Sequence, residues 1–227
     1  MGHREIALSI VAVLLLTVAS IGQPQQTDEA IEMTLLDSRD GQRYLTIGLA
    51  DMVWLAQDLN YEAPESFCYD DLEENCRLYG RLYRWETAVS SCPVGWHLTT
   101  EYEWQALERW LGMDEEYLEN YGNRGTEQAM RLKQGGDTGF NATYGGWRRS
   151  EDGAYEALGE HAAYWEGTDS SFDRAWHRDI DVDDDMIWRS PVIKPYALSV
   201  RCVKNQFQTD DNADSDMEAS GAARKWL

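Results

Sequence analysis

The sequence predicts an α+β domain of small, irregular antiparallel sheets with two or more helices, stapled by disulfides. Three observations support this fold class. An even number of cysteines follows an N-terminal segment typical of exported proteins. Helical periodicity is confined to the middle of the chain, whereas short strand-like runs between glycine turns dominate the rest. Ten tryptophans and twelve tyrosines provide enough apolar surface for a sizeable core.

The N-terminus has the pattern of a secretory signal peptide over residues 1–22. Arg4 precedes an apolar run from Ile6 to Val18, and small residues follow it. The run is shorter than the ~20 apolar residues that a membrane span needs, although an uncleaved anchor remains an alternative. We therefore expect an exported protein, which is secreted, periplasmic or at the cell surface, with no membrane span after signal cleavage.

The remainder divides by composition into three segments. Residues 23–40 are polar and lack a clear period, which fits a linker or an edge strand. Residues 41–205 form the predicted folded domain, and residues 206–227 are acidic and aperiodic, as in a disordered tail. The formal net charge of −21 disfavours nucleic acid and anionic lipid as partners, because both are attracted by basic patches.

All four cysteines lie in the predicted mature chain, and export favours disulfides over free thiols. Four cysteines allow three connectivities. Cys68 and Cys76 enclose the short segment "YDDLEEN", which indicates a local disulfide and leaves Cys92 to pair with Cys202. A zinc site is disfavoured because no C-x2-C pair occurs and the three histidines of the mature chain are scattered.

The first predicted elements are a hairpin and a helix. Tyr44–Ile47 and Met52–Leu55 are strand-like, with Gly48 and Asp51 as turn residues. In "YGRLYRWETAVSSC", helical spacing of Leu82, Trp85, Ala88 and Val89 predicts a helix that ends at Cys92.

The stretch "CPVGWHLTTEYEWQALERWL" carries the strongest local signals. Pro93 and Gly95 form a turn, and the residues from Trp96 to Leu98 resemble a short buried strand. Thr100 and Glu103 then form a capping box, which predicts the start of a helix. Trp104, Leu107 and Leu111 form its apolar stripe, and Gly112 ends it.

The rest of the domain is predicted to change from helix to strand. Two helical pieces are expected between Asp114 and Gly136, one of them capped by Thr126. Glycine turns and aromatic residues then predict short strands. Ala175–Ile180 and Met186–Ser190 form a predicted hairpin around "DVDDD".

Several blocks together resemble a known family. "DMVWLAQDLNY", "FCYDDLEENCRLYGRLYRWETAVSSCPVGWHLTTEYEWQAL", "YGGWRR" and "YALSVRCVK" are similar, in order, to the Fibrobacter succinogenes major paralogous domain. The resemblance covers Tyr44 to Lys204 and implies a C-type-lectin-like or sulfatase-modifying-factor-like fold, with no assigned biochemical role. Thr99 and "YWEGT" depart from the family pattern, and the second departure alters a loop that could line a binding surface.

Catalysis is not expected. The sulfatase-modifying relatives use a reactive cysteine pair, whereas every cysteine here has a predicted structural partner. No G-x-S-x-G motif occurs, and His97 in "GWHL" is interpreted as structural. The prediction is a non-catalytic module that binds a carbohydrate or a protein ligand. An enzyme of the sulfatase-modifying branch and a purely structural envelope protein are the alternatives.

The binding hypothesis depends on aromatic and basic residues in the turn-rich half of the domain. Such residues stack on sugar rings or anchor a protein partner, although large aromatics in short strands also fill cores. Trp147, next to two glycines, is expected to be exposed, while Trp54, Trp85, Trp96 and Trp104 are expected in the core. The candidate ligand-binding residues are Trp147, Arg148, Trp165, Trp176 and Trp188. The expected partner is a polysaccharide or a surface protein.

A weak calcium site is the remaining hypothesis. Asp181, Asp183 and Asp185 belong to an acidic run from Asp179 that concentrates the oxygen ligands calcium prefers. The run lacks the glycine and the terminal glutamate of an EF-hand loop, so a solvated hairpin tip is the favoured interpretation. No other cofactor is expected.

Overall fold

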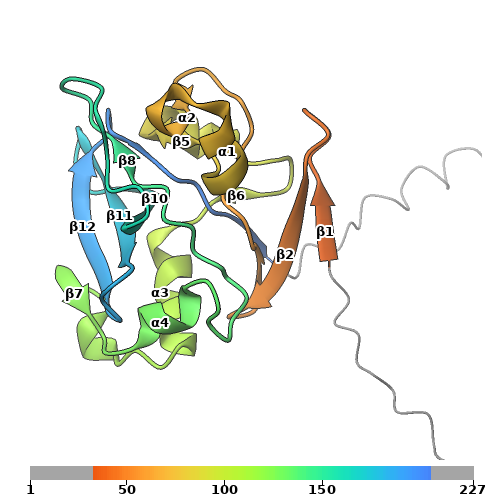
Figure 1. Cartoon of the computed structure of the whole chain (residues 1–227). Helices are drawn as coiled ribbons and strands as arrows, with labels where there is room; N and C mark the ends of the chain where they lie inside the picture. Colours follow the sequence, from red (N-terminus) through yellow and green to blue (C-terminus); the bar gives the residue numbers. More distant parts are fainter. Residues whose placement is uncertain (1–32, 206–227) are drawn as a thin grey trace, which may run out of the picture. The chain divides into compact units, whose positions relative to one another are not determined.

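Three small antiparallel sheets and four α-helices make up residues 33–205, the part of the chain that the structure describes (Figure 1). The structure is a computed structural model. The α+β class is therefore confirmed. The predicted signal peptide, residues 1–22, and the predicted tail, residues 206–227, lie outside the described residues. No helix in the described range is long and apolar enough to cross a membrane.

The first sheet joins the two ends of the domain. Its strands, in spatial order, are β1 (Met33–Leu36), β2 (Arg43–Leu49), β3 (Met52–Leu55), β14 (Cys202–Asn205) and β6 (His97–Leu98). The predicted first hairpin is confirmed, but Ala50 and Asp51 form its turn with φ of 52° and 60°, and Gly48 lies within β2. Two consecutive residues at positive φ match the twist of the flanking strands. β1 is an edge strand within the segment 23–40.

The second sheet is a meander with one strand added at its edge. Its order is β10 (His161–Asp169), β11 (Arg174–Asp181), β12 (Ile187–Ile193) and β7 (Gly122–Arg124). The predicted hairpin is confirmed, with Ile180 opposite Ile187. Two helical pieces lie between Asp114 and Gly136 as expected, a 3₁₀ turn, Glu115–Tyr117, and α4, and β7 separates them.

The third sheet consists of very short strands, which periodicity could not reveal. Its order is β4 (Ser66–Phe67), β5 (Leu82–Arg84), β13 (Ala197–Leu198), β8 (Trp147–Arg148) and β9 (Tyr155–Glu156). β5 corrects the prediction that Leu82 begins a helix. The backbone is extended up to Arg84, and the helix starts at Trp85.

The helices are short, and Figure 1 shows α1 and α2 at one side of the domain and α3 and α4 at the other. They are α1 (Glu73–Tyr79), α2 (Trp85–Ser91), α3 (Glu101–Trp110) and α4 (Gln128–Leu132), and a 3₁₀ turn, Tyr69–Asp71, precedes α1. In α3 both hydrogen bonds of the predicted Thr100–Glu103 capping box form. Glu127, not Thr126, is the N-cap of α4, and the Gln128 side chain accepts from both of their backbone N–H groups.

Two hydrophobic clusters cover opposite faces of the second sheet. Successive side chains of a strand point to opposite faces, so Tyr164 joins the first cluster and Trp165 the second. The first cluster includes Trp54 and Trp104, whose ring centroids lie 5.5 Å apart at 66°. Trp54 and Trp104 are thus core residues as predicted, whereas Trp85 and Trp96 are only partly buried against the second cluster.

A buried ionic network joins α3 to the second sheet. Glu108 is fully buried and accepts from Arg124 Nη2 at 2.5 Å and from Arg178 Nε at 2.7 Å. Arg178 also donates to Glu166, and burial raises the pKa of that carboxyl well above its ordinary value. Buried charges of this kind are tolerated only when they are paired.

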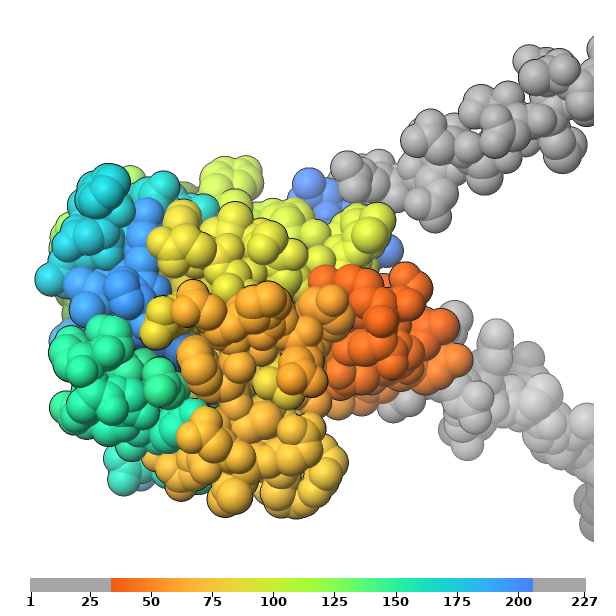
Figure 2. Space-filling model, turned by 90° about the horizontal axis from the view of Figure 1, so that it is seen from above, coloured from red at the N-terminus to blue at the C-terminus, as the bar shows by residue number. Residues whose placement is uncertain are grey.

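Both predicted disulfides are present, Cys68–Cys76 and Cys92–Cys202, and no cysteine is free. The long disulfide connects the end of α2 to β14 in the middle of the first sheet. From the side of α1 and α2, the first hairpin lies at one end of the domain and the second sheet at the other (Figures 1 and 2).

Candidate functional site

A cavity of about 300 Å³ opens on the second sheet, within the size range of small-ligand sites. We call it the Trp188 cavity. It is lined by Asn123, His161, Asp179, Asp181, Asp184, Met186 and Trp188. These residues combine one aromatic ring with carboxylates, an amide and an imidazole.

The strand register places five of these side chains, those of Asn123, His161, Asp179, Asp181 and Trp188, on one face of the sheet. Asp179 lies opposite Trp188, and Trp188 lies opposite Asn123. His161 lies opposite Asp181, two positions further along the same face. Residues paired across strands share a face, so one wall of the cavity is built on hydrogen-bonded strands, while Asp184 and Met186 come from the turn between β11 and β12.

Trp188 forms the exposed aromatic wall of the cavity. Its exposed fraction is 44%, which is high for a tryptophan in a strand. Its indole Nε1 donates to Ser190 Oγ at 2.9 Å. Gly122 faces the ring, since a Cβ on that glycine would lie 3.6 Å from a ring carbon. The ring is therefore held at a fixed tilt while part of it stays open to solvent.

The carboxylates of the cavity are held by hydrogen bonds within it. Asp179 contacts His161 Nδ1 at 3.0 Å. Asp181 accepts from the backbone N–H of Asp183, and Asp184 accepts from Asn123 Nδ2 at 2.6 Å. The hydrogen bond to Asp179 raises the pKa of His161 above its ordinary value of 6.5.

Trp147 lies behind this site and does not line it. Its ring meets His161 edge to face at 5.3 Å, and its Nε1 donates to Glu156 Oε2. Trp147 is partly buried against the second cluster, which corrects the expectation that it is the exposed tryptophan. It supports the imidazole of His161.

The other predicted ligand-binding residues are engaged elsewhere. Trp165 is fully buried and its Nε1 donates to Tyr83 O, so it cannot reach a surface ligand. The Arg148 guanidinium lies over the Phe67 ring at 4.3 Å. The Trp176 ring is half-buried and covered by the Arg189 guanidinium at 3.7 Å. Of the five residues, the structure brings only Trp188 into the cavity.

The predicted calcium ligands are not gathered around one point. Asp181 lines the Trp188 cavity, the Asp183 side chain is exposed, and Asp185 pairs with Lys133 Nζ at 3.2 Å. Within residues 33–205, the metal-ligating atoms that do converge are those of Cys68, Glu73 and Cys76, and both sulfurs belong to a disulfide. The calcium hypothesis therefore has no geometric support.

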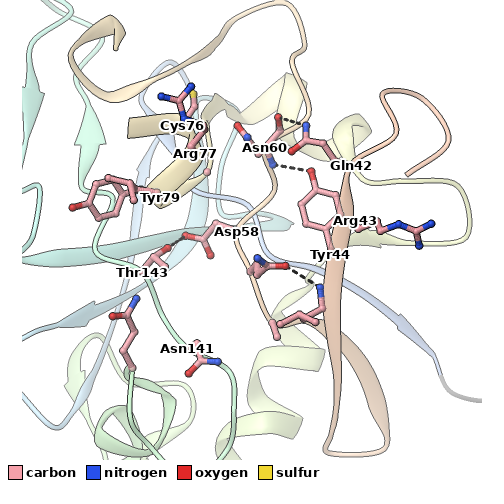
Figure 3. A pocket seen from close by; sticks show the side chains of 16 residues that line it. Gln42, Arg43, Tyr44, Asp58, Asn60, Cys76, Arg77, Tyr79, Asn141 and Thr143 are labelled. Carbon is pink, nitrogen blue, oxygen red and sulfur yellow. Dashed lines mark hydrogen bonds between the residues drawn. The ribbon is translucent and has the colours of Figure 1, made fainter. Parts of the chain in front are cut away.

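A second cavity, of about 340 Å³, lies between β2, the end of α1 and the segment before β8. Figure 3 shows Asp58 pointing at Thr143, whose hydroxyl donates to it at 2.5 Å. The other carboxylate oxygen of Asp58 accepts from the buried Arg201. Tyr44 accepts from the Asn60 backbone N–H (Figure 3). The second cavity lacks an exposed tryptophan in its lining, which is the feature that distinguishes the Trp188 cavity.

Sequence reasoning missed His161, Asn123 and Met186. Each comes from a segment whose neighbours in space depend on the sheet order. The signals in the sequence were Trp188 itself and the acidic run, three of whose members, Asp179, Asp181 and Asp184, line the cavity.

The fold and the cavity together define a disulfide-stapled α+β domain with a cavity on one face of a sheet. The chain matches the Fibrobacter succinogenes major domain over residues 35–204, and it belongs to that family. No curated protein and no solved structure matches it significantly.

Proposed function

We propose that this domain is an exported, non-catalytic module that binds a carbohydrate in the Trp188 cavity. The exposed Trp188 ring beside carboxylates and an amide is the observation that carries the proposal. Sugar rings present an apolar C–H face and hydroxyl groups at their edge. An aromatic wall suits the face, and the oxygens of Asp179, Asp181 and Asn123 suit the hydroxyls.

The proposal includes a fold of the C-type-lectin-like or sulfatase-modifying-factor-like kind. Its support is the family resemblance together with a small central sheet closed by the "SVRCV" strand and a disulfide to the turn before α3. Export is supported by the pairing of all four cysteines, because disulfides persist in oxidising compartments.

The non-catalytic part of the proposal is supported by the lining of the cavity. No serine, threonine, cysteine, tyrosine or lysine is among the lining residues. The groups that a glycosidase could use are the three aspartates, and each of them already engages a hydrogen-bond partner within the protein. The sulfatase-modifying alternative requires a reactive thiol, and the described residues contain none.

The first test is binding of the oxidised chain to an array of neutral and charged glycans, followed by titration of the selected ligand. Trp188→Ala is expected to weaken binding about tenfold or more, since losing a central aromatic contact costs about 1–2 kcal/mol. Trp110→Ala is the matched control, because Trp110 is similarly exposed at 48% but lies on α3, outside the cavity.

Equal losses in the two variants would contradict the proposed site. If no glycan on the array bound, carbohydrate would be excluded as the ligand class, and a protein partner or a structural envelope role would be favoured. Release of shorter saccharides during the titration would overturn the non-catalytic part. Unchanged circular dichroism of both variants is required before their affinities are compared.

A further inference from the structure

The charge of the Trp188 cavity restricts which saccharides it can hold. Asp179, Asp181 and Asp184 contribute three carboxylates, and no arginine or lysine is among the lining residues. Lys133 contacts the hairpin between β11 and β12, but its Nζ donates to Val182 O and Asp185, which do not line the cavity. The cavity is therefore negative in a protein whose formal net charge is already −21.

None of these carboxylates is paired with a fixed positive charge inside the cavity. Asp181 and Asp184 accept from uncharged N–H groups of the backbone and of Asn123, and Asp181 also lies 3.7 Å from His161 Nε2. His161 lies between Asp179 and Asp181, so a protonated imidazole adds one positive charge against three carboxylates and leaves the cavity negative. This contrasts with the ionic network below the sheet, where arginines neutralise Glu108.

A negative, aromatic-walled cavity discriminates among sugars by charge. Uronates, sulfated sugars and phosphorylated sugars would be repelled, and neutral sugars would gain only ordinary hydrogen bonds. A protonated amine would gain charge-assisted hydrogen bonds to the carboxylates and a favourable electrostatic contact with the indole face.

We infer that the Trp188 cavity binds an amino sugar with a free amine, such as unacetylated glucosamine, with its ring on Trp188 and its ammonium group at Asp181 and its neighbours. The inference rests on the proposed carbohydrate-binding function. It adds the chemical class of the ligand: a cationic saccharide rather than a neutral or acidic one.

The test compares β-1,4-linked glucosamine oligomers with their N-acetylated counterparts by calorimetric titration of the oxidised chain. A slightly acidic buffer keeps the amines protonated. The free-amine oligomer is expected to bind about tenfold more tightly, as is typical of a hydrogen bond to a charged group. Added salt should weaken that binding and leave any binding of the acetylated oligomer nearly unchanged.

Asp181→Asn is the decisive variant, because it removes one cavity charge at a side chain that is 39% exposed. It should reduce the preference for the free amine severalfold. Asp183→Asn is the matched control, since it removes the same charge from the same hairpin at a residue that does not line the cavity. It should leave the preference unchanged.

The possible failures are distinguishable. Equal affinity for acetylated and free-amine oligomers, with Trp188-dependent binding retained, would overturn the inference and leave the carbohydrate function standing. Equal effects of Asp181→Asn and Asp183→Asn would show attraction to the general surface charge and would also overturn it. Absence of binding to any saccharide would overturn both proposals.

Discussion

Arg201 is the clearest case of one residue holding several segments together. Its guanidinium is fully buried and donates to Asp58 Oδ1 at 2.5 Å, to Leu55 O at 3.1 Å and to Phe140 O at 2.5 Å. Burial raises the pKa of Asp58 above its ordinary value, and the charge of Arg201 opposes that rise. The ion pair thereby joins the chain after β3, the loop before β8 and the approach to β14.

Arg201→Met is expected to lower the free energy of unfolding by about 3–5 kcal/mol, because it leaves the Asp58 carboxyl buried without its partner. Urea denaturation measures the change, and Arg43→Met, at an exposed position of β2, is the control. The double variant Arg201→Met/Asp58→Leu should recover part of the loss, since no charge then stays buried. If Arg201→Met lowered the free energy of unfolding by less than about 1 kcal/mol, the Arg201–Asp58 ion pair would contribute no more than an exposed salt bridge.

At the scale of elements, the capping box of α3 both starts the helix and connects it to a neighbouring strand. Thr100 Oγ1 accepts from Glu103 N, and the Glu103 carboxylate accepts in return from Thr100 N at 2.8 Å. The same carboxylate contacts His97 Nε2 at 2.6 Å, so the cap also ties β6 to α3. Burial of Trp104 and Leu107 then fixes the rotation of the helix.

Thr100→Ala is expected to destabilise the domain by about 1 kcal/mol, the usual effect of losing an N-cap oxygen. Thr100→Ser keeps that oxygen and should lie within about 0.5 kcal/mol of the wild type. Thermal unfolding of the three proteins measures the differences. An alanine variant as stable as the serine variant would mean that water replaces the cap.

Elements with strong local chemistry could be predicted from the sequence, and elements defined by distant partners could not. The capping box and both hairpins could be predicted from residues close in sequence. Both disulfides could be predicted from the number and spacing of the cysteines. The strands of the third sheet have two or three residues, too few for a period, and β5 passes directly into α2. At the site, the predicted hairpin is enough to place Asp179 opposite Trp188. His161 and Asn123 belong to two other strands, and the local sequence does not show that these strands are neighbours in the sheet.

At the scale of the whole molecule, the two disulfides differ in how much chain they close. Cys68–Cys76 spans 8 positions, whereas Cys92–Cys202 spans 110. The long bridge also anchors β14 between β3 and β6. It should therefore restrict the unfolded chain far more than the short one.

Replacing Cys92 and Cys202 by serine should lower the free energy of unfolding by about 5 kcal/mol in the chain-entropy model, against about 2.5 kcal/mol for Cys68 and Cys76. Denaturation of the two double variants beside the wild-type chain measures the difference. A larger loss from the short disulfide would show that the packing of α1 over the third sheet, rather than loop closure, sets its contribution.

The position of β14 also bears on the timing of folding. A ribosome delivers β3 and β6 well before β14, the last of the described strands, yet those two strands are joined only through it. Until then the first sheet is split, and Arg201 and Cys202 have not reached Asp58 and Cys92. The first sheet thus cannot close before β14 has been made, and a domain with its first sheet still open suits a narrow secretion channel under the proposed export.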